Sequence, residues 1–225
     1  MNMNNISRIQ KNIEEIRRNI PDSVELLGAV KTRSVDEVQA AFDAGMRFFG
    51  HNYVQEAQAM ISEVEFKASW HLIGHLQRNK AKFAVELFDM VESLDSLRLA
   101  KELEKRCAEA GKKMPVLIEV NSGREENKTG VMPEDALALA DWLNGCEFLR
   151  LSGLMTMGPL TGDPELSRPY YKETKRLAEE IGSLHLENVR MDILSMGMSN
   201  SYQVAVEEGA TLIRLGTVIF GPRYP

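Results

Sequence analysis

The sequence has few cysteines, and their spacing fits neither a disulfide framework nor a zinc site. Of 225 residues only 2 are cysteine, Cys107 and Cys146, which lie far apart without a CxxC pattern. We expect both to behave as small buried hydrophobic residues in a reducing compartment. The expected location is therefore cytoplasmic.

Long apolar runs and an excess of basic residues are also absent. No stretch approaches the roughly 20 apolar residues that cross a bilayer, and residues 1–8 lack the apolar centre of a secretory signal. The chain has 27 Lys and Arg against 33 Asp and Glu, a net charge of -6. This balance does not favour nucleic acid or an anionic membrane, so we expect neither as a partner. Walker and Gly-x-Gly-x-x-Gly motifs are missing too.

The chain does contain a repeated alternation of short apolar segments and amphipathic segments. Short, continuously apolar runs are typical of strands buried on both faces of a parallel sheet. The expected strands are 26–30, 46–49, 70–73, 88–91, 115–120, 148–155, 189–194 and 211–215. The expected helices, with their capping residues, are 34–45, 53–65, 78–87, 95–111, 133–144, 165–182 and 199–209. Ser34, Asp95 and Ser199 are the expected N-terminal caps.

A further helix is expected over residues 3–20, where isoleucines recur every third or fourth position. We expect it to pack across one end of the fold. Eight strand–helix units without a linker or a change in composition predict one α/β domain over 1–225. The predicted fold is a single (β/α)8 TIM barrel with an extra N-terminal helix. A doubly wound open sheet is the main alternative, although it usually has fewer strands at this length.

The segment from Glu25 to Lys31 is a short uncharged run that ends in a lysine. At the carboxyl end of a barrel strand the lysine amine would be partly desolvated, which favours the neutral, nucleophilic form needed for a Schiff base. The alternative is a lysine that simply extends into water. Lys31 by itself favours this alternative, because lysines are mostly exposed residues.

In TIM barrels the chemistry lies at the carboxyl ends of the strands, where phosphate commonly binds after strands seven and eight. The residues expected at these ends are Lys31, His51, Asn52, Gly74, His75, Ser93, Asn121, Met155, Ser195 to Ser199 and Arg214 to Thr217. They include an amine and an arginine but no acidic residue. Acid/base catalysis of the glycosidase type therefore has no obvious residues here.

Two glycine-containing turns are expected to form a cup for a phosphate group. They are Ser195 to Ser199 and Arg214 to Thr217, which follow strands seven and eight. Glycine allows close approach of the backbone, and a helix N-terminus offers N–H groups to an anion. The alternative, which stays open, is that Ser199 only caps a helix and Gly216 only makes a turn.

His51 and His75 follow neighbouring expected strands. A metal site built on them would lack a third protein ligand, so we expect no metal. Stacking on a ligand, or a hydrogen bond to it, is the expected role of these histidines.

Many of these residues belong to motifs that occur in order from Leu26 onward. The motifs are Ala29-Val30-Lys31-Thr32, Phe49-Gly50-His51-Asn52-Tyr53-Val54-Gln55-Glu56, Trp70-His71-Leu72-Ile73-Gly74, Gln77-Arg78-Asn79-Lys80, Asn127-Lys128-Thr129-Gly130, Gly153-Leu154-Met155, Ser195-Met196-Gly197-Met198-Ser199 and Arg214-Leu215-Gly216-Thr217-Val218-Ile219-Phe220-Gly221. Through them the chain closely resembles the pyridoxal 5'-phosphate (PLP) homeostasis protein family. That family is similar to the N-terminal barrel of alanine racemase standing alone.

The resemblance implies PLP as the cofactor, held as a Schiff base on Lys31. The other implied cofactor-binding residues are Ser199, Gly216 and Thr217 at the phosphate, Ser195 nearby, Arg214 at the pyridine nitrogen and Asn52 beside the ring. An arginine can only donate hydrogen bonds, so the ring nitrogen opposite it would be unprotonated. An unprotonated pyridine is a poor electron sink.

The sequence departs from the family pattern at three positions. His51 stands where a glutamate is usual, His75 where a proline is usual and Arg78 where a serine is common. We expect both histidines at the rim of the site, where ligand exchange, affinity or polarity would then differ from those of the family.

We predict a PLP-binding protein that acts in intracellular PLP homeostasis, buffering or delivering the cofactor without robust catalysis. Alanine racemase takes a catalytic tyrosine from a second domain, which we expect to be absent because the chain ends soon after strand eight. The alternatives are a PLP-dependent racemase or decarboxylase, with His51 or His75 as second acid/base, and a cofactor-free Schiff-base aldolase. Apo PLP-dependent enzymes are the expected recipients of PLP, and a monomer is the expected state.

Overall fold

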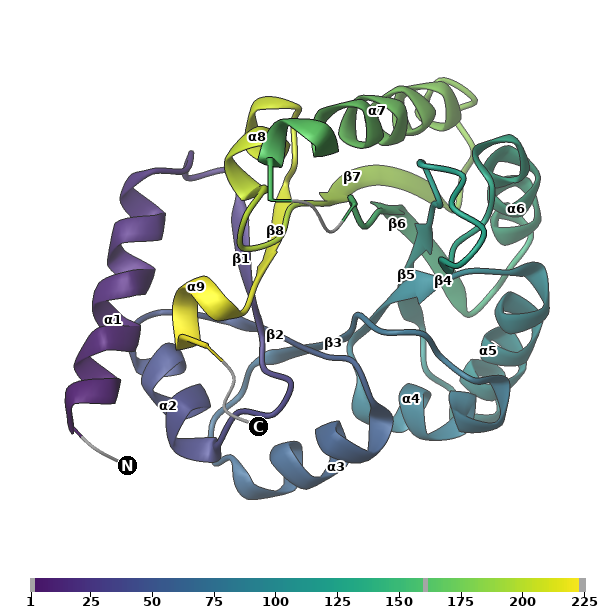
Figure 1. Cartoon of the computed structure of the whole chain (residues 1–225). Coiled ribbons are helices and arrows are strands. Elements are labelled where there is room, and N and C mark those ends of the chain that lie inside the picture. The colour runs from purple at the N-terminus through teal and green to yellow at the C-terminus, as the bar shows by residue number, and fades with distance from the viewer. Residues whose placement is uncertain (1–2, 160–161, 223–225) are drawn as a thin grey trace.

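The computed structural model describes residues 3–159 and 162–222. Eight parallel strands pair in chain order, and the eighth pairs with the first to close a barrel (Figure 1). The strands are β1 Glu25–Ala29, β2 Phe48–His51, β3 Ser69–Leu72, β4 Met90–Leu94, β5 Met114–Glu119, β6 Leu149–Met155, β7 Val189–Ser195 and β8 Leu212–Leu215. The predicted TIM barrel is confirmed.

Helices surround the barrel in Figure 1. They are α1 Met3–Arg18, α2 Val35–Asp43, α3 Val54–Glu63, α4 Ala81–Leu87, α5 Leu97–Ala110, α6 Ala136–Asn144, α7 Arg168–Gly182, α8 Tyr202–Glu207 and α9 Thr217–Phe220. Short 3-10 helices precede three of them, at η1 Arg78–Lys80, η2 Pro133–Asp135 and η3 Pro164–Ser167. The sequence analysis did not predict α9.

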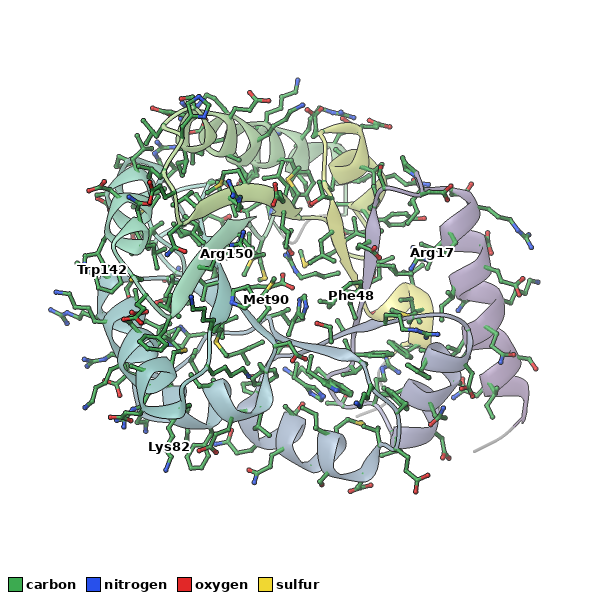
Figure 2. The ribbon with its side chains drawn as sticks, turned by 180° about the vertical axis from the view of Figure 1, so that it is seen from behind. Arg17, Phe48, Lys82, Met90, Trp142 and Arg150 are labelled. Carbon is green, nitrogen blue, oxygen red and sulfur yellow. The ribbon has the colours of Figure 1, made fainter. Side chains whose placement is uncertain are left out.

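Most of the barrel wall is buried on both faces, as the continuously apolar strands predicted, but β7 is partly exposed over residues 190–193. Alternate residues point inward, where Leu27, Ile73 and Leu212 form one small cluster. Met90 belongs to a second inner cluster, and the labelled Phe48 and Met90 lie toward the middle of the ring in Figure 2. The apolar strand side chains that point outward pack against the helices in one large core. The two faces of each strand therefore have separate surroundings.

Helix α1 belongs to the outer ring of helices. Its isoleucines Ile9, Ile13 and Ile16 are buried, which confirms the apolar stripe. The helix contacts α2 and α9 and lies beside them in Figure 1. The expectation that it crosses one end of the fold is wrong, because its stripe covers the flank of the barrel.

Two strands lie later in the chain than predicted. The turn after α2 uses Gly45, at φ +93°, and the Met46 N–H, which donates to the Ala41 carbonyl, so β2 starts only at Phe48. Phe88 similarly ends α4 by donating its N–H to Ala84. Strand β4 is therefore Met90–Leu94 instead of 88–91. The first shift makes residue 51 part of a strand, and the second brings residues 92 and 93 into the barrel wall.

Two of the three predicted helix caps are wrong by one or two residues. Ser34 and Glu37 form the predicted capping box. The cap of α5 is Ser96 and not Asp95, because the Ser96 hydroxyl accepts from the Leu99 N–H. Helix α8 follows Ser201, so Ser199 does not cap it.

The thiols of Cys107 and Cys146 are free of disulfide bonds. Burial raises the pKa of Cys107 to about 11 and that of Cys146 to about 12, so both are protonated at neutral pH. Across residues 3–159 and 162–222, no helix combines the length and the apolarity needed to cross a membrane.

Candidate functional site

All of the predicted cofactor-binding residues lie at or near the carboxyl ends of four neighbouring strands, in the order β7, β8, β1 and β2. The pairing register brings these strands close together. Leu27 of β1 lies opposite Arg214 of β8, and Ala29 lies opposite Gly50 of β2. The predicted residues therefore occupy one sector of the barrel, at its mouth and just inside it. The strand that leads to Lys31, β1, lies between β8 and β2 in this sector.

Lys31 lies two residues beyond the end of β1. Leu27 and Ala29 face the barrel interior, and strand alternation places Lys31 on the same side. The side chain is half-buried, and its Nζ lies 3.5 Å from the Tyr53 hydroxyl and 4.7 Å from the Tyr53 ring centroid. Thr32 then turns the chain sharply with φ +61°, a rare conformation for a β-branched residue. The amine thus lies at the mouth beside an aromatic ring.

Asn52 is fixed by close packing between the ends of β2 and β3. A Cβ on Gly74 would lie 2.5 Å from the Asn52 carbonyl oxygen, so a side chain at position 74 would displace this backbone. Asn52 lines a cavity of about 330 Å³ together with Tyr53, His75 and Lys80. Asn52 is therefore held at the mouth, open to a ligand.

The turns after β7 and β8 meet each other, as a phosphate cup requires. The Ser199 hydroxyl accepts a hydrogen bond of 3.4 Å from the N–H of Val218, the second residue of α9. Gly197 has φ +99°, and a Cβ there would lie 2.7 Å from the Ala205 Cβ. Only glycine fits that turn without rearrangement. The alternative that Ser199 only caps the helix after β7 is wrong, because α8 follows Ser201; the Ser199 hydroxyl instead joins the two turns.

The second turn also touches the strand that leads to Lys31. A Cβ on Gly216 would lie 3.4 Å from the Ala29 carbonyl oxygen. Gly216 precedes Thr217, the first residue of α9. The predicted phosphate residues and the predicted Schiff-base lysine are therefore on adjoining backbone.

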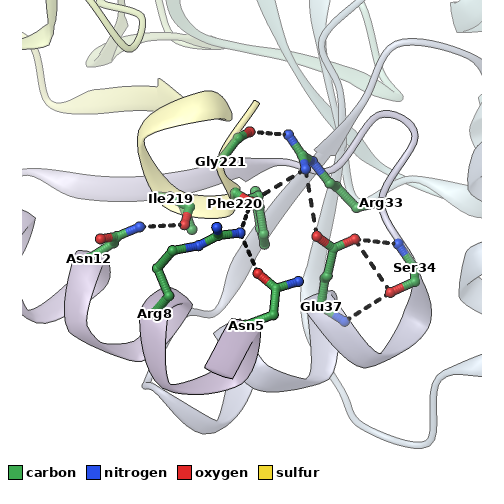
Figure 3. Close-up of polar contacts among 9 residues, drawn as sticks. All are labelled: Asn5, Arg8, Asn12, Arg33, Ser34, Glu37, Ile219, Phe220 and Gly221. Carbon is green, nitrogen blue, oxygen red and sulfur yellow. Dashed lines mark hydrogen bonds and ion pairs between the residues drawn. The ribbon is translucent and has the colours of Figure 1, made fainter. Parts of the chain in front are cut away.

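The loop after Lys31 is fastened to the end of α9 (Figure 3). Arg33 donates to the Gly221 carbonyl at 2.6 Å and to the Phe220 carbonyl at 3.4 Å, and pairs with Glu37 at 3.6 Å. From α1, Asn12 donates to the Ile219 carbonyl at 2.9 Å. These contacts satisfy carbonyls at a helix end and fix the Lys31 loop relative to the turn after β8.

Arg214 and Ser195 lie inside the barrel and are bonded to each other. The Arg214 side chain donates to the Ser195 hydroxyl at 2.5 Å and to the Thr156 carbonyl at 2.9 Å. Ser195 is fully buried, and Arg214 is 5% exposed. Ser195 thus supports the arginine from within the barrel.

Two buried residues that the sequence analysis missed complete this interior network. The Ser195 hydroxyl donates to Glu92 at 2.5 Å, and the other Glu92 oxygen lies 2.7 Å from His71 Nδ1. The His71 Nε2 lies 3.1 Å from the Ser69 hydroxyl. The available sequence signal was Glu92, a charged residue that follows the apolar residues of this strand. The predicted strand ended at residue 91, so this signal was missed. The network runs from β3 through β4 and β7 to β8.

The charge of Glu92 is stabilised by its partners. Burial on its own would raise the pKa of Glu92, but the hydrogen bond and charge of His71 act against it. The charge of Arg214 and the hydrogen bond from Ser195 also lower it, so the pKa lies below its ordinary value. Glu92 is therefore a carboxylate at neutral pH.

A second acidic residue, Glu119, ends β5. It accepts a hydrogen bond of 2.6 Å from Thr129, and burial raises its pKa, which this hydrogen bond only partly offsets. The prediction that the strand ends lack acidic residues is therefore wrong. Strand five was expected to end at Val120, which drew attention to Asn121 instead.

His51 was predicted to lie at the rim of the site, but it does not. It is 2% exposed, stacks on Trp70 with ring centroids 5.8 Å apart, and faces the layer between the wall and the helices. It borders a cavity of about 640 Å³ that Val35 and Met60 also line. Burial lowers the pKa of His51 to about 4, so the ring is neutral. Its position inside strand β2 turned it away from the mouth.

His75 does lie at the mouth, where its Nδ1 is 2.8 Å from the Asp95 carboxylate. Arg78 is exposed in η1. In the part of the chain that the structure describes, no three His, Cys, Asp or Glu side chains gather in a way that would hold a metal ion.

Comparison with known proteins gives the family. Residues 5–224 match the family model described as Alanine racemase, N-terminal domain. The pyridoxal phosphate homeostasis protein of Aquifex aeolicus is 38% identical over 219 residues, covering 97% of this chain and 95% of that protein. PipY of Synechococcus elongatus with PLP bound is 34% identical with a TM-score of 0.87, over 95% of this chain and 100% of that chain.

A more distant structure, alanine racemase of Clostridium difficile, shares the fold alone. It is 14% identical with a TM-score of 0.81, and the match covers 97% of this chain and 57% of the racemase chain. The family model and the nearly full-length relatives agree with the motifs and with the closed barrel. This chain belongs to the pyridoxal phosphate homeostasis protein family.

Proposed function

We propose that this protein holds PLP as a Schiff base on Lys31 and acts in PLP homeostasis, buffering or delivering the cofactor without robust catalysis. The observation that carries the proposal is the convergence of the predicted cofactor residues on the carboxyl ends of β7, β8, β1 and β2. Two relatives support it, since one is named a PLP homeostasis protein and the PipY structure has PLP bound.

The side chains at the mouth fit the chemical groups of PLP. When bound, PLP supplies an aldehyde that condenses with a primary amine such as Lys31. The Ser199 and Thr217 hydroxyls and the small Gly216 suit a phosphate that must approach the backbone closely. Asn52 offers an amide beside the ring.

Arg214 suits the ring nitrogen of PLP. Its guanidinium stays charged and offers only donors, five in all. Ser195 and the Thr156 carbonyl take a donor each, which fixes the plane of the group and leaves other N–H groups for a ligand. A donor at the pyridine nitrogen keeps that nitrogen unprotonated, which weakens the cofactor as an electron sink and suits a carrier.

The competing function, a PLP-dependent racemase or decarboxylase, needs a second acid/base group near the cofactor. His51 is unsuitable because it faces the helix layer. His75 keeps the alternative testable, since it lines a cavity with Asn52 and is oriented by Asp95. Amino-acid racemisation or decarboxylation that His75→Ala removes would favour the enzyme over the carrier.

The role in homeostasis has further parts. The protein acts as a cytoplasmic monomer and hands PLP to apo PLP-dependent enzymes. Mixing the PLP-loaded protein with an apo PLP-dependent enzyme, with a trap for free PLP present, tests delivery. Sedimentation of the pure protein tests the monomer.

The decisive experiment is near-visible absorbance of the purified protein with added PLP, before and after borohydride. We expect a yellow chromophore that borohydride converts to a phosphopyridoxyl group, which peptide mass mapping locates on Lys31. Lys31→Ala should abolish the fixed adduct. Lys80→Ala is the matched control, because Lys80 is a second half-buried lysine at the mouth and should keep the adduct.

A colourless protein that takes up no PLP would overturn the proposal. It would leave the cofactor-free aldolase, in which Lys31 traps a carbonyl substrate directly. An adduct on Lys80 in place of Lys31 would equally contradict the assignment of the lysine.

A further inference from the structure

The hydrogen bonds of the interior network converge on one acceptor, the Glu92 carboxylate. Arg214 can only donate, so Ser195 Oγ accepts from it and gives its own proton to Glu92. On the other side, Glu92 as a carboxylate can only accept, so His71 Nδ1 carries a proton that it donates. The Glu92 carboxylate therefore fixes the direction of the hydrogen bonds on both sides.

The network is buried throughout. Glu92 and Ser195 are fully buried, and His71 and Arg214 are 3% and 5% exposed. Arg214 Nη1 lies 3.9 Å from Glu92, so the carboxylate also neutralises the buried guanidinium. Buried polar chains of this kind orient their members strongly, because any broken link leaves a charged group without a partner.

The strands that carry the network are spread around the barrel. Glu92 belongs to β4, which lies across the barrel from β8 in the closed order of strands. Its contact with Ser195, 103 residues away in sequence, therefore spans the interior. Arg214 is supported by a residue on the opposite wall and not only by its own strand.

We propose that Glu92 is the positioning residue for Arg214: acting through Ser195, it sets the orientation of the guanidinium that faces the cofactor ring, with His71 holding Glu92 in place. This inference rests on the proposed function, because it takes Arg214 as the partner of the ring nitrogen. Glu92 itself does not contact the cofactor.

The variant Glu92→Gln tests this with little change in shape. Ser195 and His71 donate to different oxygens of Glu92, and an amide has an acceptor oxygen at only one of these two positions and a donor NH2 at the other, so it cannot accept from both partners where they now lie. One of these hydrogen bonds must reverse or break, and the negative charge beside Arg214 disappears. We expect PLP to bind about tenfold more weakly, the loss from misaligning one charge-assisted hydrogen bond. At saturating PLP, the absorbance maximum of the bound cofactor should also shift.

Glu119→Gln is the matched control. It makes the same substitution in a buried acidic residue on the adjacent strand β5, where Thr129 donates the hydrogen bond and the charge of Arg214 acts without a hydrogen-bonded link. We expect its PLP affinity to stay within about twofold of that of the parent. Its absorbance maximum should equal that of the parent within error. The absorbance maximum at saturation separates positioning from a general loss of stability, which changes occupancy but not the spectrum of bound cofactor.

A measurement on the parent protein without PLP tests the network independently. Nitrogen-15 NMR of the histidine rings should show the His71 ring protonated at Nδ1, and this signal should change in Glu92→Gln. If the parent takes up no PLP, the proposed function fails while the NMR result still decides whether the network exists.

Three results would overturn the inference. They are a Glu92→Gln protein with parental PLP affinity and spectrum, a Glu119→Gln protein that changes both as much, or a His71 ring unprotonated at Nδ1 in the parent. Should Glu92→Gln not fold, the NMR result on the parent and the Glu119→Gln spectrum decide it.

Discussion

His51 and His71 are the same residue type on adjacent strands, buried to the same depth, yet they have opposite surroundings. The exposed fractions are 2% and 3%, and the strands pair so that Gly50 lies opposite His71. His71 points into the barrel, and both ring nitrogens have partners, Ser69 and Glu92. His51 points out of it, and within the described residues neither of its ring nitrogens has a hydrogen-bond partner.

The difference shows that the two faces of the barrel wall have different structural roles. The inner face carries a connected polar network that reaches Arg214. The outer face is a packing layer, in which the His51 ring serves mainly as a flat surface against Trp70. Alternate residues of a strand face opposite sides of the wall. A shift of one position along the strand therefore decides which of these roles a histidine takes.

The largest expected effect comes from replacing each histidine by phenylalanine. His71→Phe removes the donor to a buried carboxylate, so we expect the free energy of unfolding to fall by about 3 kcal/mol. His51→Phe keeps a ring on Trp70 and removes two unpartnered polar atoms, so we expect a change within about 1 kcal/mol, in either direction. Urea unfolding at neutral pH measures both.

Equal losses in the two variants would break the comparison. They would mean that the His51 ring nitrogens have partners that matter to stability, or that the His71–Glu92 contact contributes little. A double variant should show additive effects, because the two rings lie on opposite faces of the wall.

A smaller effect is expected from acid. Burial lowers the pKa of His51 to about 4 in the folded protein, from 6.5 for the exposed group. The unfolded chain therefore binds more protons between these values. This contribution to stability is complete above about pH 6.5 and is lost as the pH falls toward 4. It should amount to about 2 kcal/mol between about pH 8 and pH 5.

The matched measurement uses the parent and His51→Phe over the same pH range. The variant should lose less stability than the parent by about that amount, whatever the other groups contribute. Parallel curves would show that His51 is not responsible, and would indicate that its ring nitrogens are hydrated in the folded protein.

Much of the fold was predictable because the strands are apolar on both faces. Continuous apolar runs such as 26–30 stand out in a sequence, and helix ends such as Gly45 carry clear signals. The same property hides the face that each residue occupies, because a strand buried on both sides has no polar alternation to read. The predicted role of His51 was therefore wrong, although the predicted strand 46–49 ended only two residues before it.

The candidate site was predictable where its residues lie in motifs and not where they depend on strand register. Lys31, Ser199 and the Gly216 turn lie in loops whose residues occur in recognisable order. Glu92 and His71 are single residues inside strands, and the contacts of Glu92 with His71 and Ser195 join strands that are 20 and more residues apart in sequence. Only the closed barrel brings such residues together, so sequence spacing alone does not reveal them.

The smallest expected effect compares two glycines, one for each face of the wall. A Cβ on Gly50 would point inward, 2.6 Å from Leu27 Cδ2 and 2.9 Å from Ile73 Cδ1. A Cβ on Gly28 would point outward, where the closest atom, at 2.9 Å, is the terminal methyl group of Met46. The Met46 side chain is flexible and can move aside, whereas Leu27 and Ile73 pack within the small inner cluster.

Alanine at either position also stabilises by restricting the unfolded chain, by about 0.5 to 1 kcal/mol. For Gly28→Ala we expect this gain to offset the contact with Met46, leaving stability nearly unchanged. For Gly50→Ala we expect a net loss of about 1 kcal/mol, because the crowded inner layer must shift. Urea unfolding of the two variants and the parent measures both changes in the free energy of unfolding. A Gly28→Ala protein that is the less stable of the two would show that the outer layer, and not the barrel interior, is the more tightly packed face.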